Sequence, residues 1–195
     1  GWHAKLVKHN QQLKVGTSEK ELKTKIRAAF NNNALFQSAI RPKSIHSVLF
    51  SRYSQGMSYD THVDNALMNN QSGLCRSDVS FTLFLNSPQE YTGGELTIEG
   101  VQEEQSYKLD AGSAIVYPST TLHRVNPVTQ GTRLVAVGWV QSIIRDSSDR
   151  ELLLCQILGY LENSRSRAGS SEQRHRVFSE NESSPFPFRN PPSSP

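Results

Sequence analysis

Between residues 45 and 141 the chain is a succession of short β-rich runs separated by Gly, Pro, Asn and Asp, and this pattern restricts the fold more than any other feature. Short strands with turn residues at regular intervals favour a mainly β sandwich or barrel. The run from Val79 to Leu85 reads as a central strand, with Phe81, Leu83 and Leu85 on one face. The expected strands cover residues 45–53, 59–64, 79–86, 94–99, 105–109, 113–117, 122–125 and 133–141.

Segments with helical spacing flank this β region. Ser18 and Glu21 form a capping box ahead of apolar residues at helical spacing, and the asparagines at 31–33 are expected to end that helix. The segment after 162 is rich in Ser, Arg, Glu and Pro, which predicts disorder. We therefore expect an N-terminal strand and helix region at 1–44, a core at 45–154, a helix at 155–161 and a disordered tail at 162–195.

The residues best suited to bind a metal lie in the predicted strand at 59–64. His62 and Asp64 are two positions apart, so in a strand they point to the same face while Val63 points away. Two ligands make a weak site, and His123, just past the apolar run 113–118, is the best third candidate. Two histidines and one carboxylate leave three open positions on iron, as in the facial triad of non-haem Fe(II) oxygenases.

Arg133 lies ten positions after His123 and completes a pattern of His-x-Asp, a distant His and then an Arg. A 2-oxo acid can take two of the open positions on iron and dioxygen the third. The far carboxylate of that acid then needs a bidentate cation, and a guanidinium has the required geometry. Arg133 lies in the predicted strand 133–141, which we expect beside the His123 strand.

Several residues compete with this assignment. Asp60 shares the parity of His62, and Asp78 is a second alternative carboxylate. Tyr53 and Tyr59 are candidates to hydrogen-bond the co-substrate, although buried tyrosines in barrels are more often core residues. The remaining side chains of this kind are expected to be packed or exposed without a role in the site, namely His3, His9, His46, His175, Phe84 and Trp139.

Composition excludes some functions. A net charge of +3, dispersed along the chain, predicts neither nucleic-acid nor membrane-surface binding. We find no signal peptide and no run long enough to span a membrane. Cys75 and Cys155 form neither a disulfide framework nor a zinc pattern. We therefore expect a reducing, cytoplasmic setting, which would also help to keep iron ferrous.

Motifs in order along the chain carry a family resemblance: residues 53–66, 76–80, 82–86, 91–96, 111–112, 116–119, 122–128 and 139–146. They resemble the bacterial PKHD-type hydroxylases, relatives of the prolyl 4-hydroxylases in the Fe(II)/2-oxoglutarate dioxygenase superfamily. The resemblance implies a double-stranded β-helix (jelly roll), Fe(II) at His62, Asp64 and His123, 2-oxoglutarate at Arg133, and L-ascorbate as the reductant of iron.

The implied activity is hydroxylation of a small molecule or peptide, with dioxygen as oxidant and conversion of 2-oxoglutarate to succinate and CO2. No motif specifies that substrate or an oligomeric state. The alternative is a non-catalytic jelly roll that binds metal without turnover. Measured against the family, we expect an N-terminal helix and strand to be missing before Gly1. The segment after Leu153 does not resemble the family, so an inactive truncated relative belongs to the same alternative.

Overall fold

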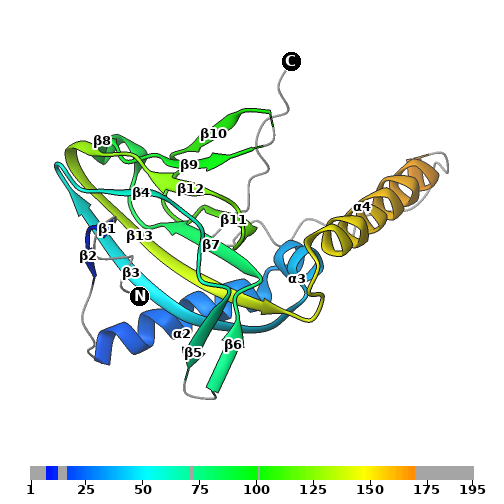
Figure 1. Ribbon diagram of the computed structural model, residues 1–195. Helices are drawn as coiled ribbons and strands as arrows, with labels where there is room; N and C mark the ends of the chain where they lie inside the picture. Colours follow the sequence, from blue (N-terminus) through cyan, green and yellow to red (C-terminus); the bar gives the residue numbers. More distant parts are fainter. Residues whose placement is uncertain (1–7, 13–16, 71–72, 101, 170–195) are drawn as a thin grey trace.

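The computed structural model describes residues 8–12, 17–70, 73–100 and 102–169, and its core is a sandwich of two antiparallel sheets (Figure 1). One is a five-stranded sheet with the order β1-β4-β12-β9-β10, and the other is a sheet with the order β11-β7-β13-β3-β2. We call the latter the six-stranded sheet, since β8 also pairs with its strand β13. This is the mainly β jelly roll expected from the sequence.

Each of the eight predicted strands has a counterpart, although the ends differ by a few residues. The counterparts are β3 (Pro42–Ser54), β4 (Ser58–His62), β7 (Val79–Phe84), β9 (Leu96–Glu99), β10 (Glu104–Tyr107), β11 (Ala114–Pro118), β12 (His123–Val125) and β13 (Val128–Ser142). The structure adds short elements that the pattern did not predict. These are β2 (Gln11–Gln12), helix α3 (Ala34–Ile40), the hairpin of β5 (Leu67–Asn70) and β6 (Gly73–Arg76), the 3-10 helix η1 (Pro88–Glu90) and β8 (Tyr91–Gly93). The predicted N-terminal strand corresponds to β1 (Lys8–His9) within the described residues.

Strand β7 is central, as predicted, and every one of its residues is buried. Phe81 and Leu83 share one face and pack in a cluster with residues of the two N-terminal helices. Phe84 faces the other way, into a second cluster that lies between the sheets. The prediction that Leu85 continues the Phe81 face is wrong, because the strand ends at Phe84 and Leu85 is 37% exposed.

Helices α2 (Thr17–Asn32) and α3 (Ala34–Ile40) cover the outer face of the six-stranded sheet (Figure 1). The rings of Phe30 and Phe81 lie 4.5 Å apart and fix α2 on β7. The helix predicted from the capping box is thus confirmed, and it ends among the asparagines. Asn33 then starts α3, because its side chain accepts a hydrogen bond from the Phe36 N–H at 2.8 Å.

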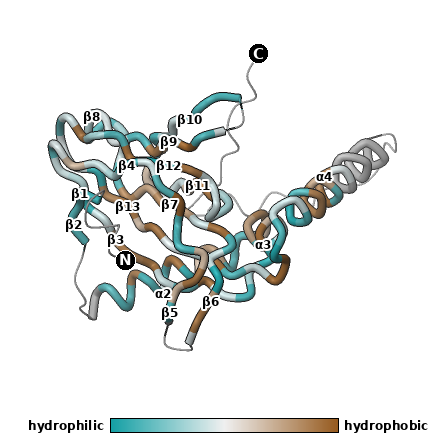
Figure 2. Tube along the Cα trace, in the orientation of Figure 1, coloured by the Kyte–Doolittle hydropathy of each residue, from teal (hydrophilic) through white to brown (hydrophobic). Residues whose placement is uncertain are grey.

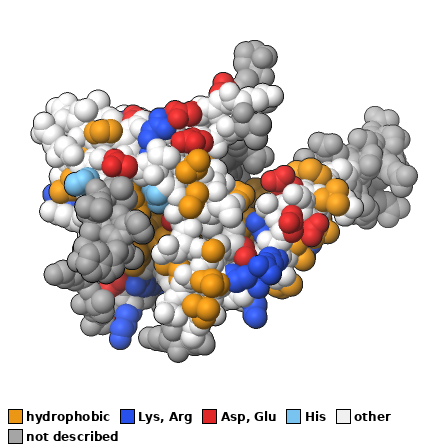
Figure 3. Space-filling view, in the orientation of Figure 1, with side chains coloured by type: hydrophobic (Ala, Val, Ile, Leu, Met, Phe, Trp, Pro, Cys, Tyr) orange, Lys and Arg blue, Asp and Glu red, His pale blue; other side chains and the backbone are white. Residues whose placement is uncertain are grey.

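Helix α4 (Ser147–Gly169) projects away from the sheets (Figure 1). It starts earlier than the predicted 155–161 because the Asp146 carboxylate accepts the Ser148 N–H at 2.8 Å. It also continues through residues 162–169, which we predicted to be disordered, since no Gly or Pro interrupts 162–168. The remainder of the predicted tail lies outside the described residues. Hydrophobic side chains gather on this helix (Figure 3), with Leu152 60% exposed.

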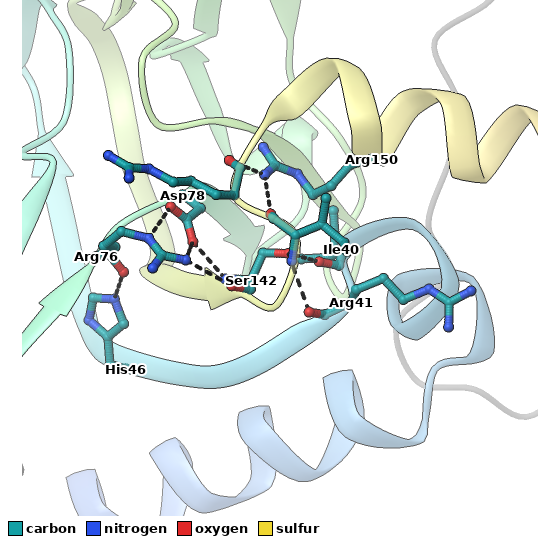
Figure 4. Close-up of polar contacts among 9 residues, drawn as sticks. Ile40, Arg41, His46, Arg76, Asp78, Ser142 and Arg150 are labelled. Carbon is teal, nitrogen blue, oxygen red and sulfur yellow. Dashed lines mark hydrogen bonds and ion pairs between the residues drawn. The ribbon is translucent and has the colours of Figure 1, made fainter.

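A polar cluster joins the ends of β7 and β13 to α3 and α4 (Figure 4). The Arg76 guanidinium donates two hydrogen bonds to the Asp78 carboxylate, each 3.1 Å long. Asp78 also accepts the Ser142 N–H, and the Ser142 hydroxyl donates to the Ile40 carbonyl. Arg150 donates to backbone carbonyls just before α4. These bonds fasten the helices to one edge of the sandwich.

Hydropathy follows the layers (Figure 2): hydrophobic residues concentrate on β7 and β13, while α2 is largely hydrophilic with scattered hydrophobic positions. The second cluster fills the space between the sheets. It combines side chains of the six-stranded sheet, among them Tyr53, Phe84 and Val135, with Leu96 and Val125 of the five-stranded sheet. None of the helices in the described part of the chain is both long and apolar enough to cross a membrane.

Candidate metal centre

His62, Asp64 and His123 converge as the sequence predicted. His62 is the last residue of β4, and His123 is the first residue of the neighbouring strand β12, directly opposite it in the register. The argument that placed Asp64 in the same strand is wrong, because β4 ends at His62. Asp64 instead lies in the following loop, where its N–H donates to the Ser119 carbonyl at 3.1 Å.

The three side chains present one ligand atom each, and these atoms all lie within 4.8 Å of one another. The His62 Nε2 is 4.0 Å from the Asp64 Oδ1, and the His123 Nε2 is 3.9 Å from the Asp64 Oδ2. Among the residues that the structure describes, no other group of three or more His, Cys, Asp or Glu has this proximity. The donor set is the two-histidine, one-carboxylate combination that suits ferrous iron.

Backbone carbonyls fix the tautomer of both histidines. The His62 Nδ1 lies 2.7 Å from the Asp60 carbonyl, and the His123 Nδ1 lies 2.9 Å from the Thr121 carbonyl. A carbonyl can only accept, so each Nδ1 carries the hydrogen and each Nε2 keeps its lone pair for a metal. Burial, reinforced by the nearby His123, lowers the pKa of His62 and favours the neutral ligand form.

An aromatic side chain covers the site on one side. The Tyr59 ring stacks on the His62 ring with centroids 3.6 Å apart and an angle of 21° between the planes. Burial and the neighbouring Asp64 charge raise the pKa of Tyr59 to about 12, so the phenol is neutral near pH 7. Stacking and the Asp60 carbonyl together restrict the orientation of the His62 ring.

Arg133 is the largest fully buried side chain of the protein's described part, with 1% of its surface exposed. Its guanidinium lies 5.1 Å from the centre of the Tyr53 ring and 5.6 Å from that of Phe84. No described residue accepts a hydrogen bond from its Nε, Nη1 or Nη2. Burial lowers the pKa of Arg133, but a guanidinium keeps its charge in proteins. A buried, unpaired cation of this kind is a ready-made carboxylate site.

The predicted position of the Arg133 strand needs correction. We expected β13 beside the His123 strand, whereas β13 belongs to the six-stranded sheet and β12 to the five-stranded sheet. Since β12 and β13 lie in different sheets, Arg133 belongs to the layer opposite the one that carries His62 and His123.

Two residues near Arg133 were missed by the sequence argument. The buried Tyr91 hydroxyl approaches the Arg133 guanidinium without reaching normal hydrogen-bond geometry. The Arg133 charge and this polar approach oppose the rise in the Tyr91 pKa that burial causes. Gly94 has φ +69°, and a Cβ there would lie 2.8 Å from Val128 Cγ2 and 3.1 Å from Arg133 Cδ. The Gly93-Gly94 turn was visible in the sequence, but its contact with Arg133 depends on long-range pairing.

The alternative carboxylates and the other described histidines do not join the three clustered side chains. Asp60 is exposed, and Asp78 pairs with Arg76 within the polar cluster described above. His46 is buried, with its Nε2 3.0 Å from the Arg76 carbonyl. Phe84 and Trp139 are buried, and Tyr53 is 3% exposed beside Arg133. His9 lies in β1, while His3 and His175 are outside the described residues.

A separate cavity of about 530 Å³ lies between α3, α4 and the edge strand β11. Its walls include Tyr117 and Ile98, which neighbour His123, but not the three ligand residues or Arg133. The cavity therefore adjoins the His123 side of the metal centre without including the three ligand candidates.

Comparison with known proteins agrees with the geometry. The sequence profile of the 2OG-Fe(II) oxygenase superfamily matches residues 48–141. A PKHD-type hydroxylase of Gloeothece citriformis is 63% identical over 153 residues, which is 78% of this chain and 69% of the relative. This chain belongs to the PKHD-type hydroxylases. A second member of the family, from Picosynechococcus, is 64% identical over 154 residues, covering 78% of this chain and 68% of its own length.

The fold of this hydroxylase also matches a solved structure. A prolyl-4-hydroxylase from Pseudomonas putida superposes with a TM-score of 0.54 at 23% identity, over 70% of this chain and 74% of that one. The family assigns the chain to the iron- and 2-oxoglutarate-dependent dioxygenases, which use Fe(II), 2-oxoglutarate and dioxygen. The His-Asp-His arrangement is consistent with that activity.

Proposed function

We propose that this hydroxylase holds Fe(II) through His62 Nε2, the Asp64 carboxylate and His123 Nε2, and holds the far carboxylate of 2-oxoglutarate on Arg133. The main observation behind this proposal is that the same structure holds two features. One is a cluster of three potential metal ligands, and the other is a buried guanidinium without a hydrogen-bond partner among the described residues. Two other arginines that could hold a carboxylate are already engaged: Arg76 binds Asp78, and Arg124 binds Glu104. Arg133 alone among the three is left for a dicarboxylate.

When bound, iron supplies the activation of dioxygen, coupled to conversion of 2-oxoglutarate to succinate and CO2. The chain supplies binding and orientation. The carbonyls of Asp60 and Thr121 hold both imidazoles with Nε2 toward the metal. Arg133 fixes the far end of 2-oxoglutarate, while Tyr53 and Tyr91 exclude water around the guanidinium. The product is a hydroxylated small molecule or peptide.

We further propose that L-ascorbate restores ferrous iron after uncoupled turnover, and that the protein works in the reducing environment of the cytoplasm. The donor set supports the first proposal, since a site of this type is active only with ferrous iron. Cysteine usage supports the second, because no disulfide joins Cys75 to Cys155.

Succinate release is the direct test. Purified protein is incubated under air with Fe(II), 2-oxoglutarate and ascorbate, and succinate is measured against the same mixture with the Asp64→Ala variant. We expect metal-dependent succinate formation with the parent and none with the variant. Parent protein that binds iron but releases no succinate would instead support a non-catalytic metal-binding module.

An untargeted search for the substrate follows from the same assay. A metabolite or peptide extract is incubated with the active protein, and mass spectrometry is used to find species that gain one oxygen atom. The Arg133→Ala variant is the control, because it keeps the metal ligands and loses the proposed 2-oxoglutarate contact. A product formed equally by both proteins would contradict the role of Arg133.

A further inference from the structure

Two buried serines lie behind the Asp64 carboxylate, and neither has a role in the function proposed above. Ser80 is on β7 and Ser119 directly follows β11, and each is 1% exposed. The Ser80 Oγ lies 2.5 Å from the Asp64 Oδ2, and the two serine Oγ atoms lie 2.8 Å apart. The hydroxyls therefore form a chain that ends on a proposed metal ligand.

The direction of these hydrogen bonds follows from the chemistry. An ionised carboxylate only accepts hydrogen bonds, so Ser80 must donate its single hydrogen to Asp64. Ser80 then has no hydrogen left for Ser119, so Ser119 donates to the Ser80 oxygen. Each bond polarises the next, which strengthens the bond to the carboxylate.

Ser119 also holds Asp64 through the backbone. Its carbonyl accepts the Asp64 N–H at 3.1 Å, while its own N–H donates to the Asp78 carbonyl at 3.2 Å. The loop that carries Asp64 is thereby tied at both the main chain and the side chain to strands of the six-stranded sheet. This closed ring of contacts compensates for the fact that Asp64 is outside β4.

We propose that Ser80 and Ser119 are positioning residues that hold the Asp64 carboxylate so that it ligates the metal through one oxygen. The two oxygens are equally near the histidines, with Oδ1 4.0 Å from His62 Nε2 and Oδ2 3.9 Å from His123 Nε2. The Ser80 hydroxyl donates to Oδ2 alone, so Oδ1 is the oxygen that we expect to ligate the metal. Binding through both oxygens would take one of the positions that the co-substrate and dioxygen need. The inference rests on the proposed metal site, and it assigns that site's geometry to residues outside the ligand set.

Metal affinity, measured without turnover, tests the proposal. Co(II) is titrated calorimetrically into the metal-free full chain for the parent and for the Ser80→Ala, Ser119→Ala and double variants. Loss of a residue that orients a metal ligand typically weakens metal binding about 10–100-fold, which we expect for Ser80→Ala. Ser119→Ala should weaken binding less, and the double variant should match Ser80→Ala, because Ser119 acts through Ser80.

A matched control separates positioning from simple loss of stability. Thr97 is also 1% exposed, and its hydroxyl forms a 2.8 Å pair with Ser106 that reaches no metal ligand. Thr97→Val should lower the melting temperature of the metal-free protein about as much as Ser119→Ala does, but leave Co(II) affinity unchanged. If Ser80→Ala does not fold, Ser119→Ala against Thr97→Val gives the same comparison.

The outcomes are distinct. Weakened Co(II) binding in the serine variants alone, with the double variant equal to Ser80→Ala, supports the proposal. Co(II) affinity within twofold of the parent in Ser80→Ala, or equal weakening in Thr97→Val, overturns it while leaving the metal site intact. A parent protein that binds no Co(II) overturns the metal site itself, and this inference with it.

Discussion

Replacing Arg133 by Met should make the ligand-free protein more stable and at the same time abolish its response to 2-oxoglutarate. All three guanidinium nitrogens are buried without a partner in the described part of the chain. Replacing even a buried ion pair with apolar side chains of similar volume is often neutral or stabilising by about 1–4 kcal/mol, and an unpaired buried cation lacks the attraction that a pair would lose. The Tyr53 and Phe84 rings offset part of the desolvation free energy of the guanidinium, since a desolvated cation–π contact contributes about 2 kcal/mol.

We therefore expect Arg133→Met to gain about 2 kcal/mol, the lower half of that range. For a chain of this length, 1 kcal/mol shifts the melting temperature by about 2–4 °C, so the gain should be about 4–8 °C. Saturating 2-oxoglutarate should instead stabilise the parent and not the Arg133→Met variant. At 100 times its dissociation constant a ligand stabilises by about 2.7 kcal/mol, but only a protein that binds it.

The assay is thermal unfolding of Zn(II)-loaded parent and variant, with and without 2-oxoglutarate. Without 2-oxoglutarate the variant should have the higher melting temperature. With 2-oxoglutarate the melting temperature of the parent should increase by about 5–10 °C, while that of the variant stays unchanged. Arg133→Lys is the control, because it keeps a buried charge but loses the bidentate fork. It should gain no stability, and in turnover it should mainly raise the KM for 2-oxoglutarate. A less stable Arg133→Met, or one that 2-oxoglutarate still stabilises, would refute the reasoning.

Three further outcomes are expected. His62→Ala and Asp64→Ala should each abolish Fe(II) binding at micromolar metal, since two ligands rarely hold this ion; metal analysis showing full iron content in both would remove the triad. Gly94→Ala should weaken 2-oxoglutarate binding roughly tenfold by displacing Arg133 while sparing metal affinity, which a titration of the loaded protein measures; an unchanged dissociation constant would contradict it. His46→Gln should lessen the loss of stability between pH 7 and 5.5. Burial lowers the pKa of His46, so the unfolded chain binds more protons as the pH falls below about 6.5; equal unfolding free-energy slopes with pH would count against this.

The strands were predictable because their signal is local. Alternating faces along Val79–Phe84 and turn residues between the runs specify a strand whatever its partners are. The short hairpin of β5 and β6 has no such alternation: Leu67 and Met68 are adjacent, and polar residues fill the turn. Helix α3 was missed for a related reason, because the asparagines that end α2 include the residue that caps α3.

The site was predictable in its residues but not in its construction. The spacing of His62 and Asp64 predicted two side chains that converge, yet strand parity was not the reason that they do. Asp64 is positioned by Ser119, a residue 55 positions later in the chain, and no local pattern encodes that contact. The same limit applied to Arg133, whose sheet depends on which strands pair and not on its distance from His123 in the sequence.

The division of the site between two sheets explains why an unpaired charge persists in its core. The ligand histidines belong to the five-stranded sheet and Arg133 to the six-stranded sheet, and apolar side chains from both layers fill the space around them. Folding alone leaves the guanidinium without an acceptor among the described residues. A dicarboxylate that reaches a metal with one end and Arg133 with the other satisfies both layers at once. On the proposed function, the unpaired guanidinium lowers stability at the 2-oxoglutarate site, and a substitution that restores stability there removes the proposed contact.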